Sequence, residues 1–224
     1  MNTYQYAINT TTVTEDMINR LSPFVSQERR LSADKYKFFI DKARCILGEY
    51  LARYALKKHY NLSDNDISFS TSTYGKPFLK DIDNIYFNIS HSGNWVVCVV
   101  GDEPLGVDVE KIAHTDLHLA ERFFTQNEYT RILECAVKDR ADEFFKLWTL
   151  KESYIKAIGK GLHMSLDSFE FRHIQDKEQL FIDNEPVDCY HFSCRRLDDS
   201  HYYALCTTST TDTIHNLEYT VLDY

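Results

Sequence analysis

The sequence predicts an α+β protein made of two similar halves, each a strand followed by helices and then by antiparallel strands. Short β-rich segments such as WVVCVV at 95–100 alternate with long stretches of helical periodicity. The same order of segments repeats after about a hundred residues, the pattern of an internal repeat. No linker rich in Pro, Gly or Ser separates the halves 1–104 and 105–224. We therefore expect them to pack closely about a pseudo-twofold axis, with a cleft between them.

The predicted elements follow the same order in both halves. In the first half, a strand at 3–8 precedes helices over 14–59 and strands at 67–71, 85–90 and 95–100. In the second half, a strand at 105–111 precedes helices over 116–159 and strands at 169–173, 179–183, 190–196 and 202–208. FVSQERR at 24–30 also resembles FFTQNEY at 123–129, and a Phe-Phe pair opens the main helix at 38 and at 144. These similarities support a duplicated module.

The composition is that of a globular protein. Of 224 residues, 43% are hydrophobic, 14% are aromatic, and only seven are glycine and four proline. The longest apolar run is too short to cross a bilayer, and the N-terminus lacks the build of a signal peptide. The six cysteines form no CxxC pair and no metal-cage spacing, so we expect free thiols. We expect a cytoplasmic protein that does not associate with membranes.

The charge is divided unevenly along the chain. Residues 29–58 hold nine basic and three acidic side chains, whereas the whole protein has a net charge of −9. An acidic protein with one basic segment indicates a local anion site, because general nucleic-acid binding requires a broadly basic face. We therefore expect no nucleic-acid partner. The alternative for this segment is a solvated lysine-rich helix.

The segment WTLKESYIKAIGKGL at 148–162 predicts a helix closed by a glycine. Its apolar residues recur at helical spacing and mark a buried face, yet Lys151 lies in that stripe and Glu152 beside it. A buried charge is costly unless a partner compensates it. Either both side chains extend past the edge of the core, or each has a partner ion. Glu152 with Lys156 is also an ordinary i,i+4 pair.

Two carboxylates lie on one face of the strand at 105–111. Alternation places Asp108 and Glu110 together, opposite Val107 and Val109. Taken alone, such a pair is more often the exposed face of a half-buried strand. With Glu152 from the helix, these carboxylates can form a partial oxygen shell around Mg²⁺ that leaves positions for water and phosphate.

Two loops offer groups that bind phosphate. TYGKPF at 73–78 presents Lys76 in a rigid turn, and NISHSG at 88–93 offers Ser90, His91 and Ser92 as hydroxyl and imidazole donors. No G-x-S-x-G elbow accompanies the adjacent Ser and His, so a serine hydrolase is not indicated. TQNE at 125–128 matches a capping box, which gives Glu128 a structural role at a helix start.

Five motifs together carry a resemblance to a known family. The motifs, in chain order, are TYGKPF at 73–78, FNISHSG at 87–93, GVDVEK at 106–111, RFFTQNEY at 122–129 and WTLKESYIKAIGKGL at 148–162. In this order and spacing the chain resembles the 4′-phosphopantetheinyl transferases of the surfactin-synthetase-activating type. The resemblance implies a monomer of two α+β halves, with coenzyme A in the cleft between them and Mg²⁺ on its pyrophosphate.

The resemblance also implies roles for individual residues. Asp108, Glu110 and Glu152 match the metal ligands, and Glu128 matches an acidic position near the metal. The positions matching contacts to coenzyme A are Arg29, Arg44, Lys76, Ser90, His91, Lys151 and Lys156. Ser32 stands where some relatives carry a second lysine, so the resemblance does not determine which side chains bind the 3′-phosphate of coenzyme A. Arg29 in place of lysine preserves the charge and adds a bidentate option.

The implied reaction is transfer of the phosphopantetheine arm from coenzyme A to a serine hydroxyl of an acyl or peptidyl carrier protein, with release of adenosine 3′,5′-bisphosphate. Glu152, or Glu128 through water, takes the serine proton, and Lys156 stabilises the leaving phosphate. Two alternatives stay open at this point. One is a binding module for coenzyme A or a carrier protein without chemistry, and the other is a metal-dependent nucleotide hydrolase.

Overall fold

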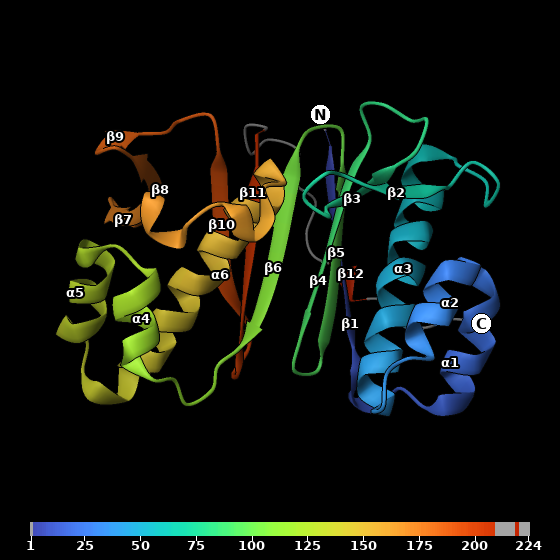
Figure 1. The fold of residues 1–224 in the computed structure, drawn as a ribbon, viewed down its shortest axis with the longest axis horizontal. Coiled ribbons are helices and arrows are strands. Elements are labelled where there is room, and N and C mark those ends of the chain that lie inside the picture. Colours follow the sequence, from blue (N-terminus) through green and yellow to red (C-terminus); the bar gives the residue numbers. More distant parts are fainter. Residues whose placement is uncertain (1, 209–217, 220–224) are drawn as a thin grey trace.

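The computed structural model describes residues 2–208 and 218–219 (Figure 1). The first half comprises β1 (Thr3–Asn9), α1 (Glu15–Leu21), α2 (Gln27–Ala33), α3 (Phe39–Tyr60), β2 (Phe69–Thr71), β3 (Pro77–Leu79), β4 (Tyr86–Ser92) and β5 (Trp95–Gly101). The second half comprises β6 (Leu105–Lys111), α4 (Leu117–Phe123), α5 (Gln126–Glu134), α6 (Arg140–Ile158), β7 (Glu170–Ile174), β8 (Lys177–Ile182), β9 (Glu185–Pro186), β10 (His191–Asp198) and β11 (His201–Thr207), and β12 (Glu218–Tyr219) follows. The 3-10 turns lie at Thr10–Thr12, Ser22–Phe24, Val137–Asp139, Gly161–His163 and Leu166–Ser168.

Both halves contain the same sheet. In the first, β1 pairs antiparallel with β5, and β5 pairs antiparallel with β4. In the second, β6 pairs in the same way with β11, and β11 with β10. A small separate sheet, β2–β3 or β7–β8–β9, precedes the last two strands of each half. The predicted α+β fold of two similar halves is confirmed, with one addition: β12 lies parallel to β1 and extends the first sheet.

Local sequence signals fix the ends of the helices. Ser26 and Thr125 cap α2 and α5, each accepting a hydrogen bond from the third residue of its helix. The helix predicted at 148–162 is the second part of α6, which ends at Gly159 with a φ of 72°. Glycine adopts this left-handed conformation without strain, so the prediction that a glycine closes the helix is confirmed. The Phe-Phe pair opens α3 as predicted, but α6 begins four residues before Phe144.

Three apolar clusters form the core. One lies in each half between the sheet and its helices. The third joins the halves, because it takes Val97 and Val99 from β5, Val107 and Val109 from β6, and Tyr203 from β11. In Figure 1 the helices α1–α3 and α4–α6 lie on opposite outer sides, with the strands of both sheets between them. None of the described helices is both long and apolar enough to span a bilayer.

β4 and β6 lie side by side where the two halves meet (Figure 1). They do not form a regular ladder, since neither sheet contains both strands. Side chains of β4 bind the backbone of β6 instead. Asn88 Oδ1 accepts from Val107 N at 2.8 Å, Ser90 Oγ lies 3.4 Å from Val109 N, and Ser92 Oγ accepts from Lys111 N at 3.1 Å. We call Asn88, Ser90 and Ser92 the seam ladder. It satisfies donors at the edge of β6 that burial would otherwise leave without partners.

Candidate active site between the two halves

The strand β6 brings two carboxylates to the boundary between the halves. Val107 and Val109 are fully buried in the third apolar cluster, so alternation directs Asp108 and Glu110 to the other face. Asp108 is only 2% exposed, whereas Glu110 is half-buried. The alternative of an acidic but exposed strand face is therefore wrong for Asp108.

Asp108 is held by Lys156 from α6 and by Ser90 from β4. Its Oδ1 accepts from Lys156 Nζ at 2.6 Å and from Ser90 Oγ at 2.8 Å. Its Oδ2 is buried and has no hydrogen-bond partner in the described part of the chain. Burial raises the pKa of Asp108, although Lys156 and Ser90 oppose the shift. An orphaned carboxylate oxygen in such a position is costly, and it indicates a site for an additional positive ligand.

Glu110 and Glu152 complete an acidic group around Asp108. Burial and the charge of Asp108 raise the pKa of Glu110 to about 7, against the hydrogen bond that Ser92 donates at 2.8 Å. Burial and Asp108 also raise the pKa of Glu152, while Lys156 lowers it. Mutual repulsion of this kind requires the carboxylates to lie near one another.

The donor set fits a divalent cation of the magnesium type. Carboxylate oxygens are the ligands that Mg²⁺ prefers. A cation bound by the three carboxylates would offset the repulsion among them, and it would give the buried Asp108 Oδ2 a partner. However, no group of three or more His, Cys, Asp or Glu side chains in residues 2–208 and 218–219 is already gathered closely enough to enclose a metal. The three carboxylates are electrostatically coupled but open, and Lys156 neutralises part of their charge.

Lys76 and Lys156 lie on one cavity. Its volume is about 220 Å³, and its lining includes Tyr74, Gly75, Asn88 and Gly159 as well as the two lysines. Lys76 Nζ donates to Leu105 O at 3.1 Å and to Ala157 O at 3.0 Å, which ties the β2–β3 turn to β6 and α6. Burial lowers the pKa of Lys76 to about 8. The cavity thus has two amines on its walls and no carboxylate in its lining.

Arg44 from α3 and His91 near the end of β4 lie close to each other. Arg44 donates to Gly93 O and, at 2.9 Å, to Asp41 Oδ1, while its Nε is buried without a partner among the described residues. His91 is an exposed residue of β4. Desolvation and the positive charges of Arg44 and Lys156 lower its pKa, which keeps the imidazole neutral near pH 7.

Arg29 lies on a second cavity of about 310 Å³, between α2, α3 and the β2–β3 hairpin. Its lining also includes Ser32, Ser70 and Thr71. Arg29 Nε donates to Glu49 at 3.2 Å, and the side chain is 38% exposed. Glu28 and Glu49 also line the cavity, so the guanidinium of Arg29 shares it with two carboxylates as well as several hydroxyl groups.

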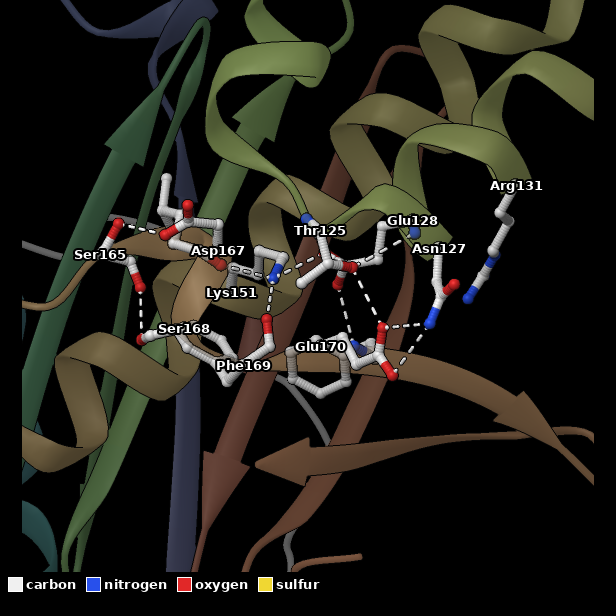
Figure 2. A network of polar contacts seen from close by, with 12 residues as sticks. Thr125, Asn127, Glu128, Arg131, Lys151, Ser165, Asp167, Ser168, Phe169 and Glu170 are labelled. Atoms are coloured by element: carbon white, nitrogen blue, oxygen red, sulfur yellow. Dashed lines mark hydrogen bonds and ion pairs between the residues drawn. The ribbon is translucent and has the colours of Figure 1, made fainter. Parts of the chain in front are cut away.

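Lys151 and Glu128 do not join this group. Figure 2 shows them together inside the second half, where Lys151 Nζ lies 2.8 Å from Glu128 Oε2 and donates to the carbonyls of Leu166 and Phe169. Both side chains are buried, with exposures of 0% and 1%. The expectation that Lys151 contacts the pyrophosphate is therefore corrected, because a fully enclosed amine has no access to a phosphate. The alternative that Lys151 extends into water is wrong too.

Glu128 has a structural role at the start of α5. The predicted capping box is present, since Thr125 Oγ1 accepts from Glu128 N and the Glu128 carboxylate accepts from Thr125 N. Its other oxygen accepts from Phe171 N at 2.9 Å. Both oxygens are occupied and enclosed, so the expectation that Glu128 takes a proton through water is corrected as well. Glu152 is then the candidate base.

Comparison with known proteins finds similarity to one family over both halves of the chain. Residues 104–206 match the 4′-phosphopantetheinyl transferase superfamily, and residues 12–103 match the N-terminal part of a 4′-phosphopantetheinyl transferase. The chain is 40% identical over 191 residues to the 4′-phosphopantetheinyl transferase psf-1 of Bacillus pumilus, covering 85% of this chain and 82% of that protein. The chain belongs to the 4′-phosphopantetheinyl transferase family.

Two further transferases show the same extent of similarity. Sfp of Bacillus subtilis (strain 168) is 38% identical over 188 residues, which is 84% of each chain. The gsp transferase of Aneurinibacillus migulanus is 42% identical over 176 residues, covering 78% of this chain and 73% of that protein. The family resemblance predicted from the five motifs is confirmed.

Sequence reasoning missed two residues that organise the site of this transferase, Asn88 and Glu49, and it predicted Ser92 only as a hydroxyl donor at a turn. Asn88 and Ser92 belong to the seam ladder, and their i, i+2, i+4 spacing with Ser90 in NISHS was a usable signal. Glu49 is 3% exposed and binds Ser26 N, Ser26 Oγ, Arg29 and Arg53. Burial raises its pKa, but these donors outweigh burial and hold the pKa below its usual range. The i,i+4 pair with Arg53 was the signal for Glu49.

Proposed function

We propose that this transferase moves the 4′-phosphopantetheine arm of coenzyme A to a serine hydroxyl of an acyl or peptidyl carrier protein, and that it acts as a monomer. Family membership supports the reaction class. One observation supports the proposal for the site. Burial and the charge of Asp108 raise the pKa of Glu110 and of Glu152, and Lys156 forms an ion pair with Asp108 at the boundary of the halves. Three acids would not help a protein that only binds an anionic ligand.

The carboxylates Asp108, Glu110 and Glu152 would hold Mg²⁺. When bound, the ion neutralises the pyrophosphate and polarises its phosphorus. Lys156, which holds Asp108 Oδ1 at 2.6 Å, would contact the phosphate from the same position. Lys76, Ser90 and His91 would contact coenzyme A, while Arg44 and Arg29 would hold the phosphates of the adenosine part.

The transfer step needs one base and one group that stabilises the leaving phosphate. The serine oxygen of the carrier attacks the phosphorus bonded to the pantetheine oxygen, and the phosphorus–oxygen bond to the adenosine part breaks. Glu152 accepts the serine proton, which its raised pKa favours. Lys156 stabilises the charge of the departing adenosine 3′,5′-bisphosphate.

Replacement of Glu152 by Gln tests the proposal directly. Arm transfer to an apo carrier protein, followed by intact mass, is expected to fall by about 10²- to 10³-fold, the effect of losing one preorganised electrostatic group. Glu185→Gln in exposed β9 is the matched control and should transfer at the wild-type rate. Undiminished transfer by Glu152→Gln would refute the assignment of Glu152.

The acceptor requirement separates transfer from other reactions. The protein is incubated with Mg²⁺ and coenzyme A, with and without apo carrier, and adenosine 3′,5′-bisphosphate is measured. Release only with the carrier supports transfer. Release without the carrier identifies a nucleotide hydrolase, and binding without release identifies a binding module. Chelation of the metal is expected to abolish release, and retained release would refute the magnesium requirement.

A further inference from the structure

Ser92 lies at the end of the seam ladder, beside the carboxylate Glu110. Its hydroxyl donates to Glu110 Oε2 at 2.8 Å and accepts from Lys111 N at 3.1 Å. Ser92 belongs to the first half and Glu110 to the second. One hydroxyl group therefore connects the backbone of β6, the carboxylate on that strand and the neighbouring half.

The number of protons on the Ser92 hydroxyl decides which of its hydrogen bonds it donates and which it accepts. A serine hydroxyl has one proton and two lone pairs. Because Lys111 N–H has to donate, Ser92 accepts there and its only proton is directed to Glu110. Ser90 follows the same pattern, since its oxygen accepts from Lys156 Nζ at 2.8 Å and its proton goes to Asp108 at 2.8 Å. Asp108 and Glu110 thus each accept a hydrogen bond from the hydroxyl of a seam-ladder serine.

Glu110 has few other groups to fix it. The described hydrogen bond to its side chain comes from Ser92, whereas Asp108 is bound by both Ser90 and Lys156. A glutamate side chain has several rotatable bonds, and holding it in one conformation costs conformational entropy. A ligand carboxylate that is already oriented avoids that cost when it binds a metal.

We propose that Ser92 is a positioning residue that orients the Glu110 carboxylate for the divalent cation. The proposal rests on the metal site of the proposed function. Loss of the hydroxyl weakens metal binding but leaves the chemical step intact, because Ser92 acts only through Glu110. Removal of an outer-shell partner of this kind typically lowers metal affinity by about 10- to 100-fold.

The test compares two variants of equal shape. Ser92→Val removes the hydroxyl, while Ser92→Thr keeps it, and both β-branched residues suit a strand. Mn²⁺ is titrated into each protein with saturating coenzyme A and no carrier, and free Mn²⁺ is followed by its EPR signal. Ser63→Ala is the matched control, because Ser63 Oγ donates to Asp66 at 2.6 Å on a remote exposed turn.

We expect Ser92→Val to raise the dissociation constant of Mn²⁺ by at least tenfold, and Ser92→Thr and Ser63→Ala to stay within twofold of wild type. At saturating Mg²⁺, the kcat of Ser92→Val should stay within threefold of wild type, while the Mg²⁺ concentration for half-maximal rate rises. Ser92→Ala provides a second deletion if the valine variant fails to fold, as judged by circular dichroism.

Three results overturn the inference in distinguishable ways. Wild-type affinity in Ser92→Val or Ser92→Ala would refute the positioning role alone. No Mn²⁺ binding by the wild-type protein would refute the metal site itself, and the inference with it. A kcat that falls at saturating metal while affinity is unchanged would also contradict the inference, because it would place Ser92 in the chemical step.

Discussion

At the boundary of the halves, burial shifts the pKa values of two residues, Lys76 and Glu110, in the direction that favours their uncharged forms. Burial lowers the pKa of Lys76 to about 8, and burial with Asp108 raises that of Glu110 to about 7. The amine and the carboxylates thus lie closer to neutrality at pH 7 than they would in water. A bound cation and a bound phosphate would each restore the charge that burial penalises.

The raised pKa of Glu110 predicts a specific dependence of stability on pH. In the metal-free protein the folded state binds this proton more tightly than the unfolded chain, whose pKa is near 4.5. The free energy of unfolding therefore declines as the pH rises from about 4.5 to 7. Glu110→Gln cannot ionise and should be more stable than wild type at pH 8 by about 1 to 3 kcal/mol, with little difference at pH 4.5.

Urea unfolding at pH 4.5 and pH 8, with chelator present, measures this difference. Added Mg²⁺ should stabilise the wild-type protein at pH 8 more than Glu110→Gln. A variant less stable than wild type at pH 8 without metal would contradict the electrostatic account.

At the scale of elements, α6 serves two separate regions. Lys151 points into the core of the second half, whereas Glu152 and Lys156, one turn apart, lie at the boundary. This explains why a lysine and a glutamate adjacent in sequence have different partners. Helical periodicity located both residues near a buried face, but it could not identify Glu128 as the partner of Lys151. That pairing depends on where α5 and the segment before β7 pack.

The close contact of α6 with β6 predicts that Gly106 cannot be replaced. A Cβ there would lie 2.2 Å from Ser153 O and 2.3 Å from Ala157 N, both backbone atoms of α6. Gly106→Ala should therefore push the helix from the strand, separate Lys156 from Asp108 and lower stability by about 3 kcal/mol. Urea unfolding and the arm-transfer rate measure the two effects.

Gly48→Ala in α3 is the matched control. A Cβ at Gly48 would contact a side-chain methyl, Ile89 Cγ2, at 3.2 Å, and alanine favours a helix interior. We expect stability within about 1 kcal/mol of wild type, because the two effects oppose each other. An equal decrease in the free energy of unfolding for Gly106→Ala and Gly48→Ala would contradict the prediction that the α6–β6 contact is the tighter one.

For the whole molecule, the third apolar cluster makes the halves one folding unit. Hydrogen bonds also cross between them, from Trp95 Nε1 to Asp198 at 2.7 Å and from Tyr203 OH to Gln5 at 2.6 Å. Neither half could keep its boundary face buried if the other unfolded. The exposed apolar surface would make a half-folded state unfavourable.

The two tryptophans test this cooperativity, because Trp95 lies in β5 and Trp148 in α6. In Trp95→Phe the remaining Trp148 reports on the second half, and in Trp148→Phe the remaining Trp95 reports on the boundary between the halves. Each fluorescence transition in urea should coincide with the loss of circular dichroism measured on the same variant. A transition of Trp148 at clearly lower urea than that variant's loss of circular dichroism would show that the second half unfolds by itself.

The sequence predicted the long strands and the duplicated order, because alternation and helical spacing are strong in those segments. It missed β3, β9 and β12, since strands of two or three residues contain no measurable period. It also identified the carboxylates from their spacing and the family motifs. The orphaned Asp108 oxygen and the seam ladder emerged only when β4 and β6 were placed side by side.

The duplicated scaffold is chemically asymmetric. β1 and β6 hold equivalent places in their sheets, yet β1 reads TYQYAIN and has no acidic residue, whereas β6 carries Asp108 and Glu110. The first copy contributes aromatic and amide side chains to packing, and the second carries the carboxylates that we propose as metal ligands. Because these acids occur in one copy only, the proposed site predicts a stoichiometry of one cation for each polypeptide.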